Sequence, residues 1–279
     1  MAKEIELITQ GIPGSFHFEA CYKYFADQNI HIKQTASFLD LAEGLISDST
    51  IDYGVMAIEN SIAGSIIQNY KILREHRFRI VGELYLEVHH NLLLFPGSQL
   101  EDIKEVRSHP MALNQCLGYL KKHPHIKLVP TGDTASSAKF IQENQSSDIS
   151  AIASAYAAKL YGLEIAAARI QASKINYTRF VIIQPDDKEI PEGTFNKASI
   201  YIRTQHKKGS LLKVLQKVYD ADINLSKLQS YPVEDNLNQY YFYLDLEFDD
   251  PVQYEKVIVE LEKVTQRLEV LGVYEKHKL

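Results

Sequence analysis

Side chains that carry hydroxyl and amide groups recur where predicted strands give way to predicted helices. They are Ser15 in GIPGSF (11–16), Asn60 and Ser61 in ENSIAGS (59–65), Ser108 and Gln115 in SHPMALNQC (108–116), and Thr134 in DTASSAK (133–139). Hydroxyls, amides and the free backbone N–H groups at a helix N-terminus can all bind an anion. Since these turns contain few carboxylates, together they predict a site for an anionic small molecule. Each serine or threonine could equally cap its helix, and that interpretation stays open for every turn taken alone.

A further polar pair opens an otherwise apolar strand. In NYTRFVIIQP (176–185), Thr178 and Arg179 come directly before the apolar run 180–183. A short continuous apolar run is typical of a strand that is covered on both faces. Polar side chains at the mouth of such a strand are expected to face a crevice. Thr178 and Arg179 are therefore candidates for contact with the same small molecule.

Other kinds of site fit the sequence less well. The neighbouring His89 and His90 would point to opposite faces of a strand, and HPH (123–125) lies in a lysine-rich loop, so we expect no metal site. The G-x-S-x-G elbow of many hydrolases is missing from the sequence. The glycine turn 11–16 also lacks the G-x-G-x-x-G spacing of a dinucleotide-binding loop.

Composition narrows the class of protein and its surroundings. The 279 residues include 30 Lys plus Arg against 36 Asp plus Glu, a net charge of -6, which argues against nucleic-acid binding. Cys21 and Cys116 fit neither a disulfide framework nor a metal-ligand spacing, so we expect reduced thiols. The N-terminal stretch lacks the apolar core of a signal peptide, and no later stretch approaches a membrane span. We therefore expect a cytoplasmic protein that contacts neither nucleic acid nor membrane.

The elements that must position these residues alternate along the first 184 residues. Predicted strands cover 5–9, 53–59, 79–95, 126–130, 149–154 and 178–184, and predicted helices cover about 17–27, 36–48, 65–76, 110–122, 134–144 and 154–161. Such alternation predicts an α/β fold with a largely parallel sheet. The run 79–95 is expected to cross between two sheets and 178–184 to cross back. Two subdomains, about 1–78 plus 178–184 and 79–177, would then enclose a cleft.

A different pattern follows a linker. Residues 185–196, PDDKEIPEGTFN, combine prolines, glycine and acidic residues, as linkers do. From residue 197 the strand and helix periodicities follow the order βαββαβ, which predicts a ferredoxin-like sandwich. Asp250 before Pro251 gives a start signal for its second helix.

The order of these motifs resembles prephenate dehydratase. The matching segments are GIPGSF, ENSIAGS, SHPMALNQC, DTASSAK, AIAS followed by YGL, and NYTRF, and the tail with KKGSLLKVL and LQSYP resembles the ACT regulatory domain of the monofunctional enzymes. The resemblance covers nearly the whole chain. It implies a two-lobed catalytic domain over 1–184, similar to type II periplasmic binding proteins, followed by the linker 185–196 and an ACT domain over 197–279.

The resemblance also implies a reaction in phenylalanine biosynthesis. Such a lyase removes water and carbon dioxide from prephenate and gives phenylpyruvate, without a cofactor because restored aromaticity drives the step. Thr178 matches the family threonine that assists the leaving hydroxyl. The residues that would bind or position the substrate are Ser15, Asn60, Ser61, Ser108, Gln115, Thr134, Arg179 and Phe180. For Arg179, orientation of a carboxylate and support of the loop both remain open.

Regulation is implied for the C-terminal domain. The family binds phenylalanine between two ACT motifs, which here are Gly209, Ser210, Leu211 and Leu212 together with Gln229, Ser230, Tyr231 and Pro232. The usual ESRP reads QSYP and the usual GAL reads GSL, so a Glu and an Arg of the common motif are absent. The resemblance further implies a homodimer or homotetramer that is joined through the ACT domains.

Two other functions remain open on the sequence. Arogenate carries an amino group in place of the keto group of prephenate, and the site residues do not exclude it as the substrate. A non-catalytic sensor that binds a small anion would share the two-lobed fold, although it would not require the group Thr178, Arg179 and Phe180. Turnover of the two substrates discriminates all three functions.

Overall fold

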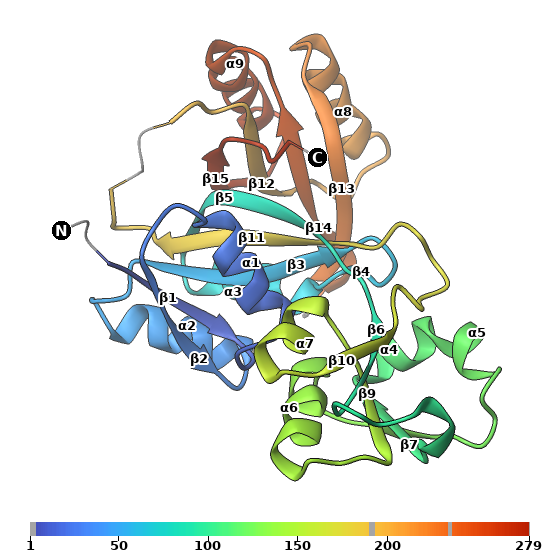
Figure 1. The fold of residues 1–279 in the computed structure, drawn as a ribbon. Helices are drawn as coiled ribbons and strands as arrows, with labels where there is room; N and C mark the ends of the chain where they lie inside the picture. The colour runs from blue at the N-terminus through green and yellow to red at the C-terminus, as the bar shows by residue number, and fades with distance from the viewer. Residues whose placement is uncertain (1–3, 190–192, 234–235, 279) are drawn as a thin grey trace. The chain divides into compact units, whose positions relative to one another are not determined.

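The chain crosses three times between two parts that pack separately (Figure 1). The computed structural model describes residues 4–189, 193–233 and 236–278. The first unit contains the residues up to Gly64 together with Tyr85–Phe180, and the second contains Ser65–Leu84 together with the residues from Val181 onward. Strands β5 (Phe78–Glu87) and β11 (Tyr177–Pro185) run from one unit into the other.

The first unit begins with a sheet whose N-terminal strands are parallel to one another. Its first elements are β1 (Ile5–Gln10), α1 (Phe16–Tyr24), β2 (Ile30–Thr35), α2 (Phe38–Ser47), β3 (Tyr53–Asn60) and the short β4 (Gly64–Ser65). Strand β1 pairs in parallel with β2 and β3, and the order of the sheet is β2-β1-β3-β11-β5, with β4 beside β3. Leu7, Ile8 and Met56 are completely buried. The central strands therefore carry apolar residues on both faces, as covered parallel strands require.

A second sheet of the first unit follows along the chain. Its elements are β6 (Asn91–Leu94), a 3-10 turn η1 (Leu100–Asp102), β7 (Glu105–Ser108), α4 (Pro110–Gln115), α5 (Leu117–Leu120), β8 (Lys127–Pro130), α6 (Thr134–Asn144), β9 (Ile149–Ala153), α7 (Ala155–Tyr161) and β10 (Glu164–Ala167). The strand order is β10-β6-β9-β7-β8, with β7 parallel to β8 and β9 and with β6 antiparallel to its neighbours. Leu92 and Leu94 pack into one apolar cluster and Leu93 into another, because strand side chains alternate between faces.

The α/β class and the crossing predicted for the run 79–95 are confirmed. The run divides into β5 in the first sheet and β6 in the second. The continuous helix predicted over 110–122 is wrong, because the backbone leaves the helical region at Cys116 (φ −99°, ψ 3°) and separates α4 from α5. Strands β2, β7 and β10 were not predicted. They have only four to six residues each and contain polar or exposed positions.

The second unit contains the predicted βαββαβ order. Its elements are β12 (Lys197–Arg203), α8 (Ser210–Asp220), β13 (Asn224–Val233), β14 (Asn236–Glu247), α9 (Pro251–Glu262) and β15 (Arg267–Tyr274), in an antiparallel sheet of order β13-β14-β12-β15. This is a ferredoxin-like topology. Ile200, Ile202 and Leu244 pack beneath the helices with Val214 and Val257. Asp250 caps α9 and Pro251 takes its first position, which confirms the predicted helix start.

Residues 65–84 lie against this sheet within the second unit. Helix α3 (Ile67–Glu75) places Tyr70 with its ring centroid 4.5 Å from that of Tyr243, and Arg74 donates to the Tyr201 hydroxyl at 3.1 Å. In β15, a Cβ on Gly272 would overlap the carbonyl oxygen of Ile80, so only glycine permits this approach. The predicted domain boundary at residue 184 stays a prediction, because this grouping rests on packing alone.

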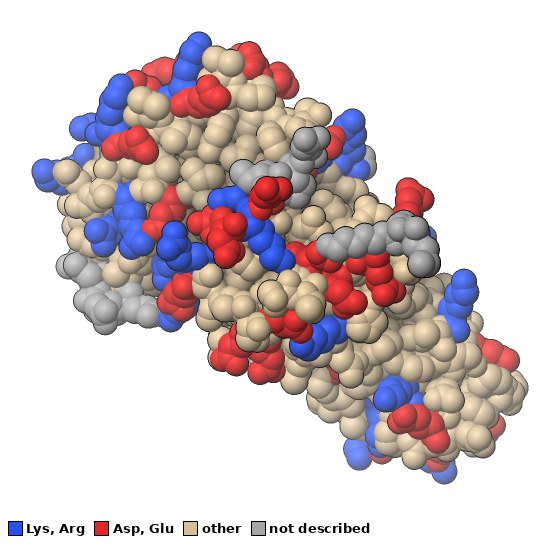
Figure 2. All heavy atoms as spheres, turned by 90° about the vertical axis from the view of Figure 1, so that its left-hand side faces the viewer, with Lys and Arg blue, Asp and Glu red and all other residues tan. Residues whose placement is uncertain are grey.

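Positive and negative side chains are mixed over the surface shown in Figure 2. Lys and Arg are interspersed with Asp and Glu over the face shown in Figure 2, without a continuous basic stripe among the residues drawn in colour. In the part of the chain that the structure describes, no helix is both long and apolar enough to cross a membrane. Nor do the described His, Cys, Asp and Glu residues form a group of three or more that could hold a metal ion.

Candidate functional site

The ends of two neighbouring strands bring Asn60 and Thr178 together. Asn60 is the last residue of β3 and Thr178 the second of β11. The Asn60 amide nitrogen Nδ2 lies 3.0 Å from Thr178 Oγ1, 2.8 Å from Asn176 Oδ1 and 3.2 Å from the Tyr177 carbonyl oxygen. Thus 118 residues of sequence separate two side chains that are in direct contact. The predicted association of the Asn60 turn with the mouth of the strand 178–184 is present in the fold.

The backbone fixes which way the Asn60 amide points. Its oxygen Oδ1 accepts hydrogen bonds from the backbone N–H groups of Ile62 at 3.0 Å and Ala63 at 2.9 Å. Because these two groups can only donate, the NH2 group of Asn60 must face Thr178 and Asn176. Thr178 Oγ1 is therefore the acceptor in its bond with Asn60. The Thr178 proton stays available to donate to a ligand.

A chain of neutral side chains continues from Asn60. The Asn176 amide donates to Gln115 Oε1 at 3.0 Å, and His90 Nε2 lies 2.9 Å from the same oxygen. Asn176 is 1% exposed. Gln115, at the end of α4, is thereby joined to the strand that carries Thr178. This chain has five members and no formal charge when His90 is neutral.

Three of the other predicted hydroxyls have partners in the protein. Ser61 Oγ accepts from Tyr177 N–H at 3.0 Å and so ties β3 to β11, while Ser108 Oγ donates to the Ile152 carbonyl at 2.6 Å. Ser15 caps α1 by accepting from Phe18 N–H. Thr134 is buried in the first turn of α6. Their part in substrate binding stays a prediction.

Three of the expected caps are corrected. Ser61 could have capped the next helix, but α3 begins after Ile66 without a side-chain cap. Helix α4 is capped by His109, which accepts from Met111 N–H, instead of by Ser108. Helix α6 is capped by Asp133, which accepts from Ser136 N–H at 2.7 Å, instead of by Thr134.

Arg179 and Phe180 are both buried. The Arg179 side chain is 2% exposed, with its guanidinium 3.9 Å from Glu59 Oε2 and 5.9 Å from the ring centroid of Tyr85. The contact between Glu59 and Arg179 therefore joins β3 to β11 next to Asn60 and Thr178. Phe180 meets the ring of His17 edge-on, at a centroid distance of 5.0 Å.

Two histidines flank the site, the half-buried His17 and the buried His90. Burial lowers the pKa of His17 to about 4, and its Nε2 accepts from Ala57 N–H. Burial also lowers the pKa of His90 to about 4, against the opposing effect of its bond to Gln115. Both rings are therefore neutral at pH 7. On the sequence, His90 was considered only as a metal ligand and its place in this chain was missed, because the strand predicted over 79–95 hid the break at which it lies.

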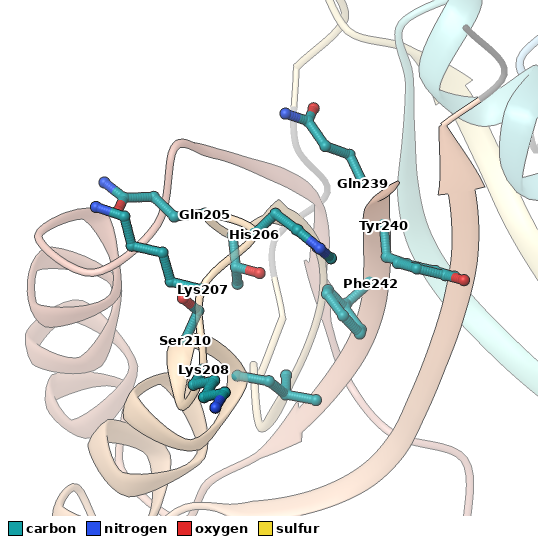
Figure 3. A pocket seen from close by; sticks show the side chains of 10 residues that line it. Gln205, His206, Lys207, Lys208, Ser210, Gln239, Tyr240 and Phe242 are labelled. Carbon is teal, nitrogen blue, oxygen red and sulfur yellow. The ribbon is translucent and has the colours of Figure 1, made fainter. Parts of the chain in front are cut away.

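The second predicted site lies in the second unit. Gly209 adopts φ +80° at the cap of α8, a conformation that favours glycine. A pocket of about 420 Å³ opens beside it (Figure 3). Its lining residues are Thr204, Gln205, His206, Lys207, Lys208, Ser210, Leu211, Gln239, Tyr240 and Phe242. Ser210 and Leu211 belong to the predicted phenylalanine site.

Strand β13 carries the other half of that site. Lys227 Nζ donates to Ser65 Oγ at 2.8 Å, and Ser65 Oγ lies 3.4 Å from Gln229 Oε1. Ser65 directly follows the turn that begins with Asn60. Gln229 of the predicted effector site is thereby in contact with Ser65, within the second unit.

Comparisons with known proteins agree with the resemblance of the motifs. A family model described as prephenate dehydratase matches residues 7–188. A prephenate dehydratase of Methanocaldococcus jannaschii is 33% identical over 261 residues, 87% of this chain and 93% of that protein. A structure of the prephenate dehydratase of Staphylococcus aureus subsp. aureus Mu50 is 26% identical, with a TM-score of 0.83 over 97% of this chain and 100% of that one. Another structure, described as GqqA, a novel type of quorum quenching acylase, is 29% identical with a TM-score of 0.85 over 98% of each chain.

Proposed function

The chain belongs to the prephenate dehydratase family, and from this premise we propose that it converts prephenate into phenylpyruvate, water and carbon dioxide. The observation that carries the proposal is the bond of 3.0 Å from the Asn60 amide to Thr178 Oγ1, which leaves the Thr178 proton free. That proton is then directed at the substrate hydroxyl. A similar structure is described as an acylase, so the fold alone does not select the reaction.

Thr178 donates a hydrogen bond to the hydroxyl as it leaves. The C–O bond to this hydroxyl and the C–C bond to the ring carboxylate break, so that the ring becomes aromatic and the carboxylate leaves as carbon dioxide. The hydroxyl departs as hydroxide and becomes water by taking one proton from solvent. A threonine hydroxyl is too weak an acid to be fully deprotonated at pH 7, so its contribution is a hydrogen bond that strengthens as negative charge develops on the oxygen. The donation from Asn60 makes the Thr178 hydroxyl a better donor, because hydrogen bonds in series polarise one another.

The charge of the site suits a dianion. Prephenate carries two carboxylates, and the members of the bonded chain from Thr178 to Gln115 are uncharged. The carboxylate of Glu59, next to Asn60, lies beside the guanidinium of Arg179 at 3.9 Å. Ser15, Ser61, Ser108, Thr134, Arg179 and Phe180 complete the proposed substrate site. Cys21 and Cys116 are buried free thiols, which supports a reducing compartment and hence the cytoplasm.

We also propose that the chain consists of a two-lobed catalytic domain and an ACT regulatory domain. The two α/β sheets of residues 5–185 support a two-lobed catalytic domain similar to type II periplasmic binding proteins. The ferredoxin-like topology of β12 to β15 supports an ACT regulatory domain over 197–279. Phenylalanine would bind there, at Gly209–Leu212 and Gln229–Pro232, and reduce activity. The contacts among Ser65, Lys227 and Gln229 supply a route from that site to the turn after Asn60.

A second copy of the chain is the proposed partner of this domain. Within the described residues, strand β13 lies at the edge of its sheet and pairs with β14 alone. Leu212 and Tyr219 on α8 are 66% and 78% exposed, and Leu228 on β13 is 43% exposed. An open strand edge next to exposed apolar side chains favours pairing with an identical edge, which would give a homodimer or a tetramer of such dimers.

Turnover of prephenate tests the proposed function. The purified protein is incubated with prephenate at pH 7, and phenylpyruvate is followed against the spontaneous reaction. Formation of phenylpyruvate well above the spontaneous rate is expected. A rate no higher than the spontaneous one, together with tight binding of prephenate, would instead indicate a non-catalytic sensor. Arogenate in a parallel reaction shows which of the two substrates is preferred.

A further inference from the structure

His90 contacts two of the predicted substrate-binding segments. Its Nε2 bonds to Gln115, and its ring meets Phe16, the neighbour of Ser15, edge-on at 6.0 Å. The imidazole therefore lies beside the segments that carry Ser15 and Gln115.

The hydrogen-bonded chain fixes the tautomer of this histidine. The backbone N–H groups of Ile62 and Ala63 fix the oxygen of Asn60, so its NH2 group faces Asn176 Oδ1. The NH2 group of Asn176 must then face Gln115 Oε1, which is an acceptor and nothing else. Since His90 Nε2 lies 2.9 Å from this oxygen, Nε2 carries the proton. The other ring nitrogen, Nδ1, is left as a bare acceptor.

That acceptor is buried and has no partner in the described part of the protein. His90 is 5% exposed, and no group among residues 4–189, 193–233 and 236–278 hydrogen-bonds to its Nδ1. A buried acceptor without a donor costs free energy, and such atoms are rare in folded proteins. The half-buried His17 differs, because its Nε2 accepts from Ala57 N–H.

We infer that His90 Nδ1 accepts a hydrogen bond from a donor group of the bound substrate. The inference rests on the proposed function. The carboxylates and the keto group of prephenate are acceptors only, so its ring hydroxyl is the single group that can donate to Nδ1. Arogenate offers the same hydroxyl and, in addition, an ammonium group. An acceptor at this place therefore binds the ring hydroxyl common to both substrates or selects for the ammonium group of arogenate.

Two substitutions separate the two nitrogens of the ring. His90→Gln keeps an N–H group near the position of Nε2, so that Gln115 stays oriented, but removes the acceptor. His90→Asn keeps an amide near the position of Nδ1 but gives up the donor to Gln115. The values of kcat/KM for prephenate and for arogenate are measured for both variants and the wild type, and circular dichroism and thermal unfolding report whether each variant is folded.

His90→Gln is expected to lower kcat/KM at least about tenfold, as the loss of one hydrogen bond to substrate does. An equal loss with both substrates supports the ring hydroxyl as the donor, and a loss with arogenate alone supports the ammonium group. Wild-type kcat/KM of this variant with both substrates would overturn the inference. Failure of the wild type to turn over either substrate would instead contradict the proposed function, so the two failures are distinguishable.

Nitrogen NMR of the wild type labelled with ¹⁵N-histidine tests the inference without a variant. The free protein at pH 7 is expected to show His90 with its proton on Nε2 and a bare Nδ1. Substrate is then added in large excess, so that the protein stays saturated while the signal is recorded. The Nδ1 signal should shift toward that of a hydrogen-bonded nitrogen. A proton on Nδ1 in the free protein, or an Nδ1 signal that substrate does not move, would overturn the inference.

Discussion

Replacement of Asn60 by aspartate would reverse the hydrogen bond that orients Thr178. The new carboxylate would keep one oxygen for the N–H groups of Ile62 and Ala63, which now lie 3.0 and 2.9 Å from the amide oxygen. Its second oxygen would stand where the amide nitrogen lies 3.0 Å from Thr178 Oγ1. The Thr178 hydroxyl would then have to donate to this carboxylate. Its proton would no longer be available to the leaving hydroxyl.

Two losses follow from this geometry. Removal of one donor to developing charge typically lowers kcat by about 100- to 1000-fold, or about 2.7–4 kcal/mol of transition-state stabilisation. The new oxygen would also face Asn176 Oδ1 and the Tyr177 carbonyl, now 2.8 and 3.2 Å from the amide nitrogen, and neither can donate to it. Because each acceptor loses its donor, we expect the free energy of unfolding to fall by about 2 kcal/mol.

The assay compares the formation of phenylpyruvate by the wild type, Asn60→Asp and a charge control. Asn114→Asp on the exposed side of α4 adds the same charge without touching the bonded chain, and should keep wild-type activity. Urea denaturation gives the stability of each protein. Acidification should restore part of the lost kcat to Asn60→Asp, because a protonated carboxyl can again donate to Thr178. The reasoning is refuted if Asn60→Asp keeps more than about a tenth of the wild-type kcat at pH 7, a barrier change below about 1.4 kcal/mol.

Two further predictions concern regulation and stability. Lys227→Met removes the donor to Ser65 and should weaken inhibition by phenylalanine about fivefold, a coupling of about 1 kcal/mol. Replacement of the exposed Lys213 by Met should leave the inhibition unchanged. Equal inhibition of both variants in a phenylalanine titration would contradict the route through Ser65. For pH, the pKa of His17 and of His90 is about 4 in the folded protein but about 6.5 when unfolded. The unfolded state then binds more protons below pH 6.5, so the free energy of unfolding should fall between pH 7 and 5 by about 2 kcal/mol for each ring. Urea denaturation at pH 7 and pH 5 measures this difference in the free energy of unfolding, and His17→Gln should remove about half of it. An unchanged difference would show that His17 does not cause it.

Local signals in the sequence predicted the elements and the turns. Gly, Pro and the apolar run 180–183 mark positions whose conformation depends on near neighbours. The chain of side chains was not predictable in this way, because its bonds join residues 25 to 118 positions apart. Asn60 and Thr178 were selected by motif, whereas His90 was considered only as a possible metal ligand. The break at Cys116 and the short strand β2 were missed because apolar periodicity alone distinguishes poorly between a continuous helix and two short ones, or between an edge strand and a loop.

The surface against which residues 65–84 pack could not be predicted from the sequence either. Helix α3 has an apolar face with Tyr70 and Leu73 buried, and such a face predicts burial without naming the surface that covers it. That surface carries Tyr201, Tyr241 and Tyr243, whose rings pack with Tyr70 and Arg74.

Donation from the Thr178 hydroxyl to the departing hydroxyl of the substrate is measured by comparing kcat of two variants. Thr178→Val has nearly the shape of the wild type, whereas Thr178→Ser keeps the hydroxyl and the acceptor for Asn60. Thr178→Val is expected to lose about 100- to 1000-fold in kcat, while Thr178→Ser should stay within about tenfold of the wild type. A Thr178→Val protein that is folded and forms phenylpyruvate at close to the wild-type rate would contradict it.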